Sequence, residues 1–140
     1  MSPRAARTFG AAHLATAALV GFGGFVGLPS RWAPVDAAAA ALTILHAAAG
    51  GGLLRGARWG ERAARVTSGV SLAVGLSLVT TLAVTASWLG GVYGPVGAGG
   101  AVILALVGAL ALPYLVVAPC VELVWLGRPG AREEREGRSP

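Results

Sequence analysis

Three ionisable side chains lie inside long apolar segments of this sequence. His13, His46 and Glu122 lie about five, eight and four residues from one end of their segments, so at a helical rise of about 1.5 Å per residue their depths are roughly 8, 12 and 6 Å. Imidazole and carboxylate groups hold and pass protons, and ionisable groups within membrane helices are functional candidates by default. These three side chains are therefore a candidate polar cluster, which Cys120 or Tyr114 could join.

Each member of this cluster also has a structural explanation. A histidine can hydrogen-bond a carbonyl or hydroxyl across a helix pair, Glu122 can pair with Arg128 or reach water, and Cys120 can be a small packing residue. No metal site is expected, because three converging ligands are needed and the sequence has neither His-x-x-x-His nor Cys-x-x-Cys spacing.

A bis-histidine haem b is a sharper alternative. His13 and His46 lie at comparable depth on different helices, and Gly-rich segments could admit a porphyrin. The propionates could meet arginines of the middle segment, namely Arg58, Arg62 or Arg65. Because adjacent helices of a hairpin often lie too close to hold a macrocycle, the first expectation is that no cofactor binds.

Hydroxyl groups form a stripe on one of the apolar segments. At 100° per residue its members fall within about 40° of one line, and they are Thr67, Ser71, Thr81 and Thr85. Such stripes usually hydrogen-bond a neighbouring helix in lipid. The alternative is the lining of a polar pore.

Small residues form further faces that predict close helix packing, within a subunit and between subunits. These residues are Gly23, Gly27, Gly69, Ala73, Ala101, Ala105 and Ala109.

The composition is that of an integral membrane protein. Of 140 residues 55% are hydrophobic and only 12% are charged, against roughly 25% charged in soluble domains. Each span needs about 20 residues, so the length allows four spans with short loops and no soluble catalytic domain. The sequence also lacks a Gly-rich phosphate loop and a nucleophile–base pairing, and we do not expect an enzyme.

One charged interval divides the chain. Residues 55–65 contain Arg55, Arg58, Arg62 and Arg65 with Glu61. A charge at mid-membrane costs at least about 2.5–3.5 kcal/mol, so this interval is predicted to be a water-facing loop between two helical hairpins.

The sequence therefore predicts an all-α, up-down bundle of four transmembrane helices. They are expected at about 8–28, 35–54, 66–89 and 96–126, with outer turns at 29–34 and 90–95. Residues 1–127 form the membrane domain, and residues 128–140 are predicted to be a disordered cytoplasmic tail.

Arginine placement predicts the orientation. Of the 11 basic residues only Arg31 falls in an outer turn, so both termini and the middle interval are expected in the cytoplasm.

Lys, Asn and Gln are absent; their codons are AT-rich, which suggests a GC-rich bacterium and hence its inner membrane. Because the arginines cluster at helix ends, lipid headgroups are expected as partners and nucleic acid is not.

Two segments suggest that the hairpins are tandem copies. Arg4–Arg7 is identical to Arg62–Arg65, and Trp32–Ala37 parallels Tyr93–Ala98. Two-span units repeated in one orientation predict a pseudo-two-fold axis along the membrane normal. Chance matching in Ala-rich sequence is the alternative.

The last apolar segment is too long for one straight span. Its length of about 31 residues exceeds a ~30 Å core by more than 10 Å. Pro113 and Pro119 offer a continuous kinked helix, which we favour, or a break near Ala118 followed by an interfacial helix over 120–126.

Three functions fit these features. The first is a non-enzymatic bundle that self-associates or serves as a structural subunit of a membrane assembly. The second is a channel or carrier for protons, ions or a small solute, which would use the intramembrane His and Glu side chains. The third is a haem- or quinone-linked redox subunit.

Overall fold

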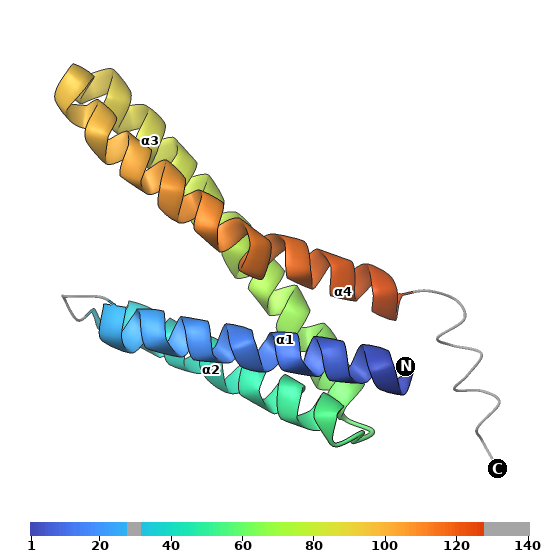
Figure 1. The fold of residues 1–140 in the computed structure, drawn as a ribbon. Helices are drawn as coiled ribbons and strands as arrows, with labels where there is room; N and C mark the ends of the chain where they lie inside the picture. Colours follow the sequence, from blue (N-terminus) through green and yellow to red (C-terminus); the bar gives the residue numbers. More distant parts are fainter. Residues whose placement is uncertain (28–31, 128–140) are drawn as a thin grey trace, which may run out of the picture. The chain divides into compact units, whose positions relative to one another are not determined.

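The computed structural model describes residues 1–27 and 32–127, and all elements in this part of the chain are helical, as predicted. Helix α1 (Pro3–Phe22) continues into the π-helical segment η1 (Gly23–Gly27), and α2 spans Ala33–Leu54. Helix α3 (Gly60–Leu112), the π-helical segment η2 (Pro113–Val117) and α4 (Ala118–Leu126) complete the fold (Figure 1).

Three helical stretches of the described residues are long and apolar enough to cross a membrane. They are Pro3–Val26, Ala33–Leu54 and Gly60–Leu126. Large apolar side chains are exposed along each stretch, including Leu19, Ile44 and Leu110. A soluble protein would bury such residues, so the exposed surface fits the predicted membrane protein.

The chain divides into two compact units, which are described separately. Unit 1 contains Met1–Ser68 and the segment that begins at Glu122, and unit 2 contains Gly69–Val121. In unit 1, α1 and α2 lie side by side as an antiparallel pair (Figure 1). Their backbones meet at Gly10 and Gly50: a Cβ added at Gly50 would lie 2.8 Å from the Gly10 carbonyl oxygen. This approach is possible only because both residues lack a side chain.

In unit 2, α3 is interrupted at Gly94 and its two arms fold back on each other (Figure 1). Gly94 has φ 55° and ψ −134°, a conformation that L side chains avoid, and Pro95 follows it. The arms keep a constant antiparallel register, in which Gly75 faces Leu115, Leu82 faces Gly108 and Leu89 faces Gly100. Just before the turn, Trp88 and Tyr93 of the first arm make an edge-to-face contact, with 6.0 Å between ring centroids.

Two helix starts differ from the prediction. α1 begins at Pro3 rather than at residue 8, because Ser2 caps it by accepting a hydrogen bond from the Ala5 amide. α3 begins at Gly60 rather than at residue 66, so the interval 55–65 is only partly a loop. The charges exclude this interval from hydrocarbon, but they do not prevent a helix from continuing into water. Arg62 and Arg65 accordingly lie on α3.

The second outer turn is also shorter than predicted. Helix continues through Tyr93, so only Gly94 of the predicted turn 90–95 leaves helical geometry. At the first turn α2 begins at Ala33, two residues early, and residues 29–31 lie outside the described residues. The predicted tail, 128–140, also lies outside them.

The last segment is one continuous helix rather than two. Pro113 opens the π-helical segment η2, and the Ala118 amide donates to the Pro113 carbonyl, a spacing of five residues. A bond over five residues is that of a π-helical turn, and such a wider turn lets the helix continue past a proline. Helix α4 then runs through Pro119 without a break.

Candidate functional site

His13 lies at the centre of a buried hydrogen-bonded cluster in unit 1. Its Nδ1 lies 2.8 Å from the Nδ1 of His46, across the α1–α2 pair. Its Nε2 lies 3.1 Å and 3.0 Å from the two carboxylate oxygens of Glu122 on α4. Both nitrogens of the His13 ring are therefore engaged, each with a group that can bind a proton.

Ser68 extends the cluster to a fourth side chain. Its hydroxyl on α3 donates to Glu122 Oε2 at 2.5 Å, a short distance typical of a hydroxyl bonded to a carboxylate. The order of contacts is Ser68, Glu122, His13, His46. We call these four residues the relay cluster.

The relay cluster is shielded from its surroundings. His13, His46 and Glu122 are 4%, 2% and 4% exposed, and Ser68 is fully buried. Burying an isolated ionisable side chain costs free energy, because its hydrogen bonds to water are lost. In this cluster the side chains hydrogen-bond one another instead. Within residues 1–27 and 32–127, no buried side-chain nitrogen or oxygen lacks a hydrogen-bond partner.

The His13–His46 contact permits only one proton between the rings. Two Nδ1 atoms at 2.8 Å need one N–H donor and one lone pair, so the two histidines hold complementary states. His13 can donate from Nε2 to Glu122 and accept at Nδ1, or carry both protons as imidazolium facing the carboxylate. When the cluster gains or loses one proton, the remaining protons can therefore move along the existing hydrogen bonds between His46, His13 and Glu122.

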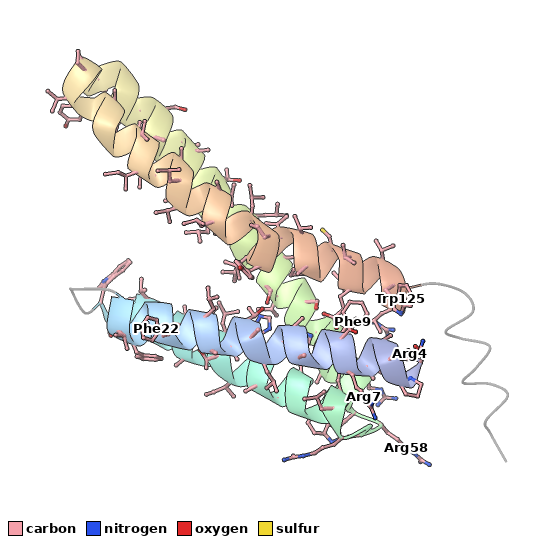
Figure 2. The ribbon with its side chains drawn as sticks, viewed as in Figure 1. Arg4, Arg7, Phe9, Phe22, Arg58 and Trp125 are labelled. Carbon is pink, nitrogen blue, oxygen red and sulfur yellow. The ribbon has the colours of Figure 1, made fainter. Side chains whose placement is uncertain are left out.

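An aromatic pair covers the relay cluster on one side. Phe9 lies one turn before His13 and Trp125 one turn after Glu122, and their ring centroids are 6.2 Å apart (Figure 2). The adjoining core residues are apolar and buried, namely Ala49, Leu53, Ala64 and Leu126.

Cys120 and Tyr114 do not share the environment expected for them. Cys120 is exposed, and Tyr114 is 44% exposed. On a helix, two residues separate side chains by about 200°, which places Cys120 on the face opposite Glu122. Neither residue therefore shares the burial of Glu122, and their membership of the cluster stays a prediction.

The predicted hydroxyl stripe has two different halves. Thr67 and Ser71 are buried, and Thr67 donates to the Leu45 carbonyl of α2. Thr81 is exposed and donates to the Ser77 carbonyl of its own helix, while Thr85 is half-buried. Ser68 was missed by the stripe, although its spacing of three residues from Ser71 could have indicated it.

Most of the predicted small-residue faces point away from neighbouring helices. A Cβ added at Gly23 or Gly69 would meet nothing within 4 Å, and Ala73, Ala105 and Ala109 are exposed. Ala101 is half-buried, and Gly27 ends η1. Close approach within a unit instead uses other glycines, namely Gly10, Gly50, Gly60 and Gly75. The outward faces remain available to lipid or another subunit, and self-association stays a prediction.

The geometry does not favour haem ligation. The two histidine rings contact each other, with centroids 5.0 Å apart, so a porphyrin would have to part them and break the bond to Glu122. Among the described residues, no group of three His, Cys, Asp or Glu side chains is arranged to hold a metal ion.

Removing the Ser68 hydroxyl should destabilise the relay cluster. Ser68→Ala leaves Glu122 Oε2 without its 2.5 Å donor, and loss of a hydrogen bond to a charged group costs about 1.5–3 kcal/mol. We expect a lower unfolding temperature in detergent. Ser87→Ala is the matched control, because the Ser87 hydroxyl is exposed and bonds only the Ala83 carbonyl of its own helix. Equal unfolding temperatures for the two variants would contradict the contact.

The relay cluster is assembled from four separate helices, which explains why no contiguous motif marks it. Its chemistry is limited to binding and passing protons, since it offers two imidazoles, a carboxylate and a hydroxyl in series. Comparison with family models, with curated proteins and with solved structures gives no match to this chain.

Proposed function

We propose that this chain is a proton-relaying protein of the bacterial inner membrane, with both termini in the cytoplasm. One observation carries the proposal, namely the unbroken line of hydrogen bonds from Ser68 through Glu122 and His13 to His46. A structural role needs each polar group to be satisfied, but it does not need three proton-binding groups in series. Membrane proteins that move protons use such chains of Asp, Glu and His.

The turn at Gly94 supports four spans. The segment Gly60–Leu126 is far longer than one span, and the reversal at Gly94 divides it into two arms, each able to cross a core of about 30 Å. Arg4, Arg7 and Arg58 lie at one end of the α1–α2 pair and Phe22 at the other (Figure 2). An arginine-bearing end is the cytoplasmic end by the positive-inside rule.

Burial supports the tandem repeat. The offset that superposes Arg4 on Arg62 also places Gly10 on Ser68 and His13 on Ser71, and all of the latter four are buried. The relay cluster would then be shared between the copies, with His13 and His46 in the first and Ser68 and Glu122 in the second.

The relay works by displacement of protons along the chain. The step starts from a His46 imidazolium, a neutral His13 with its proton on Nε2, and a Glu122 carboxylate. When His46 passes its Nδ1 proton to His13 Nδ1, it stays neutral with a proton on Nε2, and His13 Nε2 releases its own proton to Glu122. His13 is then left with its proton on the opposite nitrogen. A second transfer requires the tautomer to reset, by ring rotation or by the reverse movement.

Proton flux into liposomes tests this proposal. Purified protein is reconstituted with a pH-sensitive dye inside, and a potassium diffusion potential drives protons inward. We expect acidification that rises with protein content and exceeds that of empty liposomes. Flux equal to that of empty liposomes would contradict proton conduction.

Cysteine labelling tests the four-span topology. In a Cys120→Ser background, Val92→Cys is expected to react with an impermeant maleimide in intact cells, because it adjoins the outer turn. Ala57→Cys, in the loop between α2 and α3, should react only after lysis. Labelling of Ala57→Cys in intact cells, or of both positions from the same side, would contradict the topology.

A further inference from the structure

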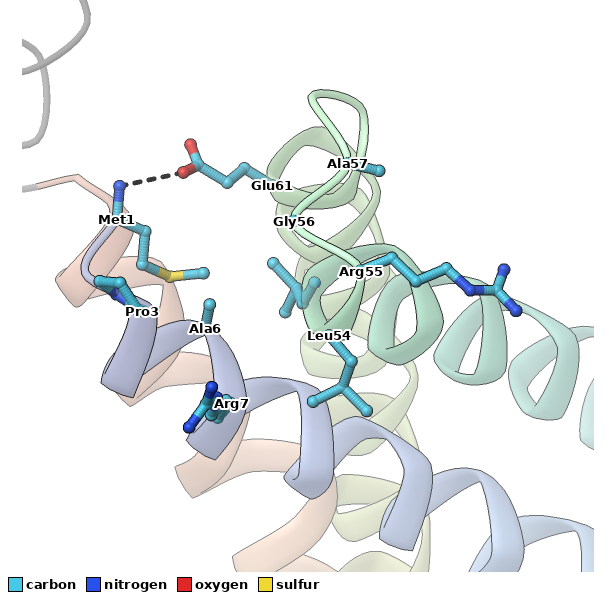
Figure 3. A pocket seen from close by; sticks show the side chains of 10 residues that line it. Met1, Pro3, Ala6, Arg7, Leu54, Arg55, Gly56, Ala57 and Glu61 are labelled. Atoms are coloured by element: carbon cyan, nitrogen blue, oxygen red, sulfur yellow. Dashed lines mark hydrogen bonds and ion pairs between the residues drawn. The ribbon is translucent and has the colours of Figure 1, made fainter.

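We infer that a pocket at the arginine-bearing end of unit 1 binds the phosphate of an anionic phospholipid headgroup. The cavity measures about 410 Å³ and lies between the start of α1 and the α2–α3 loop (Figure 3). This inference uses none of the relay cluster, so it stands whether or not the protein moves protons.

The pocket has a surplus of positive charge. Arg7 and Arg55 line it, as does one carboxylate, that of Glu61. The Met1 ammonium pairs with Glu61 at 3.1 Å (Figure 3), so this carboxylate is already neutralised. Both guanidiniums are on exposed side chains, and among the described residues neither has an ion-pair partner. Figure 3 shows the Arg55 guanidinium directed away from Arg7, so to share one phosphate this exposed side chain has to turn back over the pocket. Guanidiniums suit a phosphate, which accepts their paired N–H donors.

The remaining lining suits the apolar part of a lipid. Leu53 and Leu54 form part of the wall with Pro3 and Ala6. Leu53 is 3% exposed and belongs to the apolar core of unit 1, whereas Leu54 is 45% exposed. A ligand that bears a phosphate beside an apolar chain would match both surfaces, and a small soluble phosphate would match only the arginines.

The location also fits a lipid. Arg7 lies six residues before His13 on α1, or about 9 Å along the helix axis toward the end where the arginines gather. Headgroup phosphates occupy this level of a bilayer, outside the hydrocarbon core. Polybasic groups at that level attract anionic lipids.

Native mass spectrometry of the full chain in detergent tests this inference. We expect retained phosphatidylglycerol, little phosphatidylcholine, and a loss of phosphatidylglycerol affinity on the order of tenfold or more in an Arg7→Gln/Arg55→Gln variant. The matched control is Arg4→Gln/Arg58→Gln, which removes the same charge from exposed residues that do not line the pocket. Its affinity should stay within about twofold of the wild type.

Three results would overturn the inference. Equal losses in the two double variants would mean diffuse attraction by net charge rather than a pocket. Undiminished binding in Arg7→Gln/Arg55→Gln would exclude these arginines. Glycerol 3-phosphate that competes as well as phosphatidylglycerol, mole for mole, would show that a free phosphate compound is the ligand and not a lipid.

Discussion

Replacing Glu122 by glutamine is expected to reduce proton flux into liposomes by about 10²-fold or more, the typical contribution of a positioned acid–base group. The amide has nearly the shape of the carboxylic acid and can still bond His13 and Ser68, so the fold should persist. It cannot, however, exchange a proton with the His13 ring, which removes one link from the relay cluster. The measurement is the initial acidification rate at equal protein content.

Glu61→Gln is the matched control for this prediction. It removes a carboxylate from the same protein, but one that pairs with the Met1 ammonium and is not part of the relay cluster. Its flux should remain close to that of the wild type. Flux in Glu122→Gln within twofold of the wild type, or an equal loss in Glu61→Gln, would be inconsistent with the relay.

Filling the helix crossing at Gly50 is expected to have the largest effect on stability. A Cβ at this position would lie 2.8 Å from the Gly10 carbonyl oxygen and 2.9 Å from the Leu14 side chain. The Gly10 carbonyl belongs to the backbone of α1 and cannot change rotamer as a side chain can, so α1 and α2 must separate. We expect Gly50→Val to lower the free energy of unfolding by about 1–3 kcal/mol or more, as overpacking typically does. Thermal unfolding in detergent measures this change.

The neighbouring glycine supplies the control. A Cβ at Gly51 would meet nothing within 4 Å, although it lies on the same helix in the same conformation. Gly51→Val therefore changes helix propensity by the same amount and leaves the crossing intact. Because His13 and His46 face each other across this crossing, Gly50→Val should also lower proton flux. Similar unfolding temperatures for the two variants would argue against the crossing.

Composition and charge were sufficient to predict the helical class. Long apolar runs interrupted by arginines leave few alternatives, because backbone groups in lipid must be satisfied within helices. Helix ends were less accurate. The charges around Arg62 mark where hydrocarbon ends, and a helix can extend past that point, as α3 does from Gly60. Ser2 and Pro3 carried a capping signal that the apolar pattern alone did not use.

The sequence predicted how deep in the membrane the site residues lie, but not which face of each helix they occupy. Similar depth from the helix ends selected His13, His46 and Glu122, which the structure brings together. Depth says nothing about the face of a helix, and Cys120 and Tyr114, which were grouped with them by depth, are exposed. Ser68 has no distinguishing feature among several hydroxyls, and only its packing against Glu122 identifies it. The rotation of each helix about its own axis is determined by close contacts, such as Gly10 against Gly50, that involve residues far apart in the sequence.

Solid-state NMR of protein labelled with ¹⁵N in histidine tests the relay cluster most directly. The chain has 2 histidines, so every ring signal belongs to His13 or His46. Nitrogens that share a proton at 2.8 Å should show a coupling between the two Nδ1 atoms, and Glu122→Gln should shift the signals of both rings. Two uncoupled histidines that do not respond to Glu122→Gln would contradict a shared proton path.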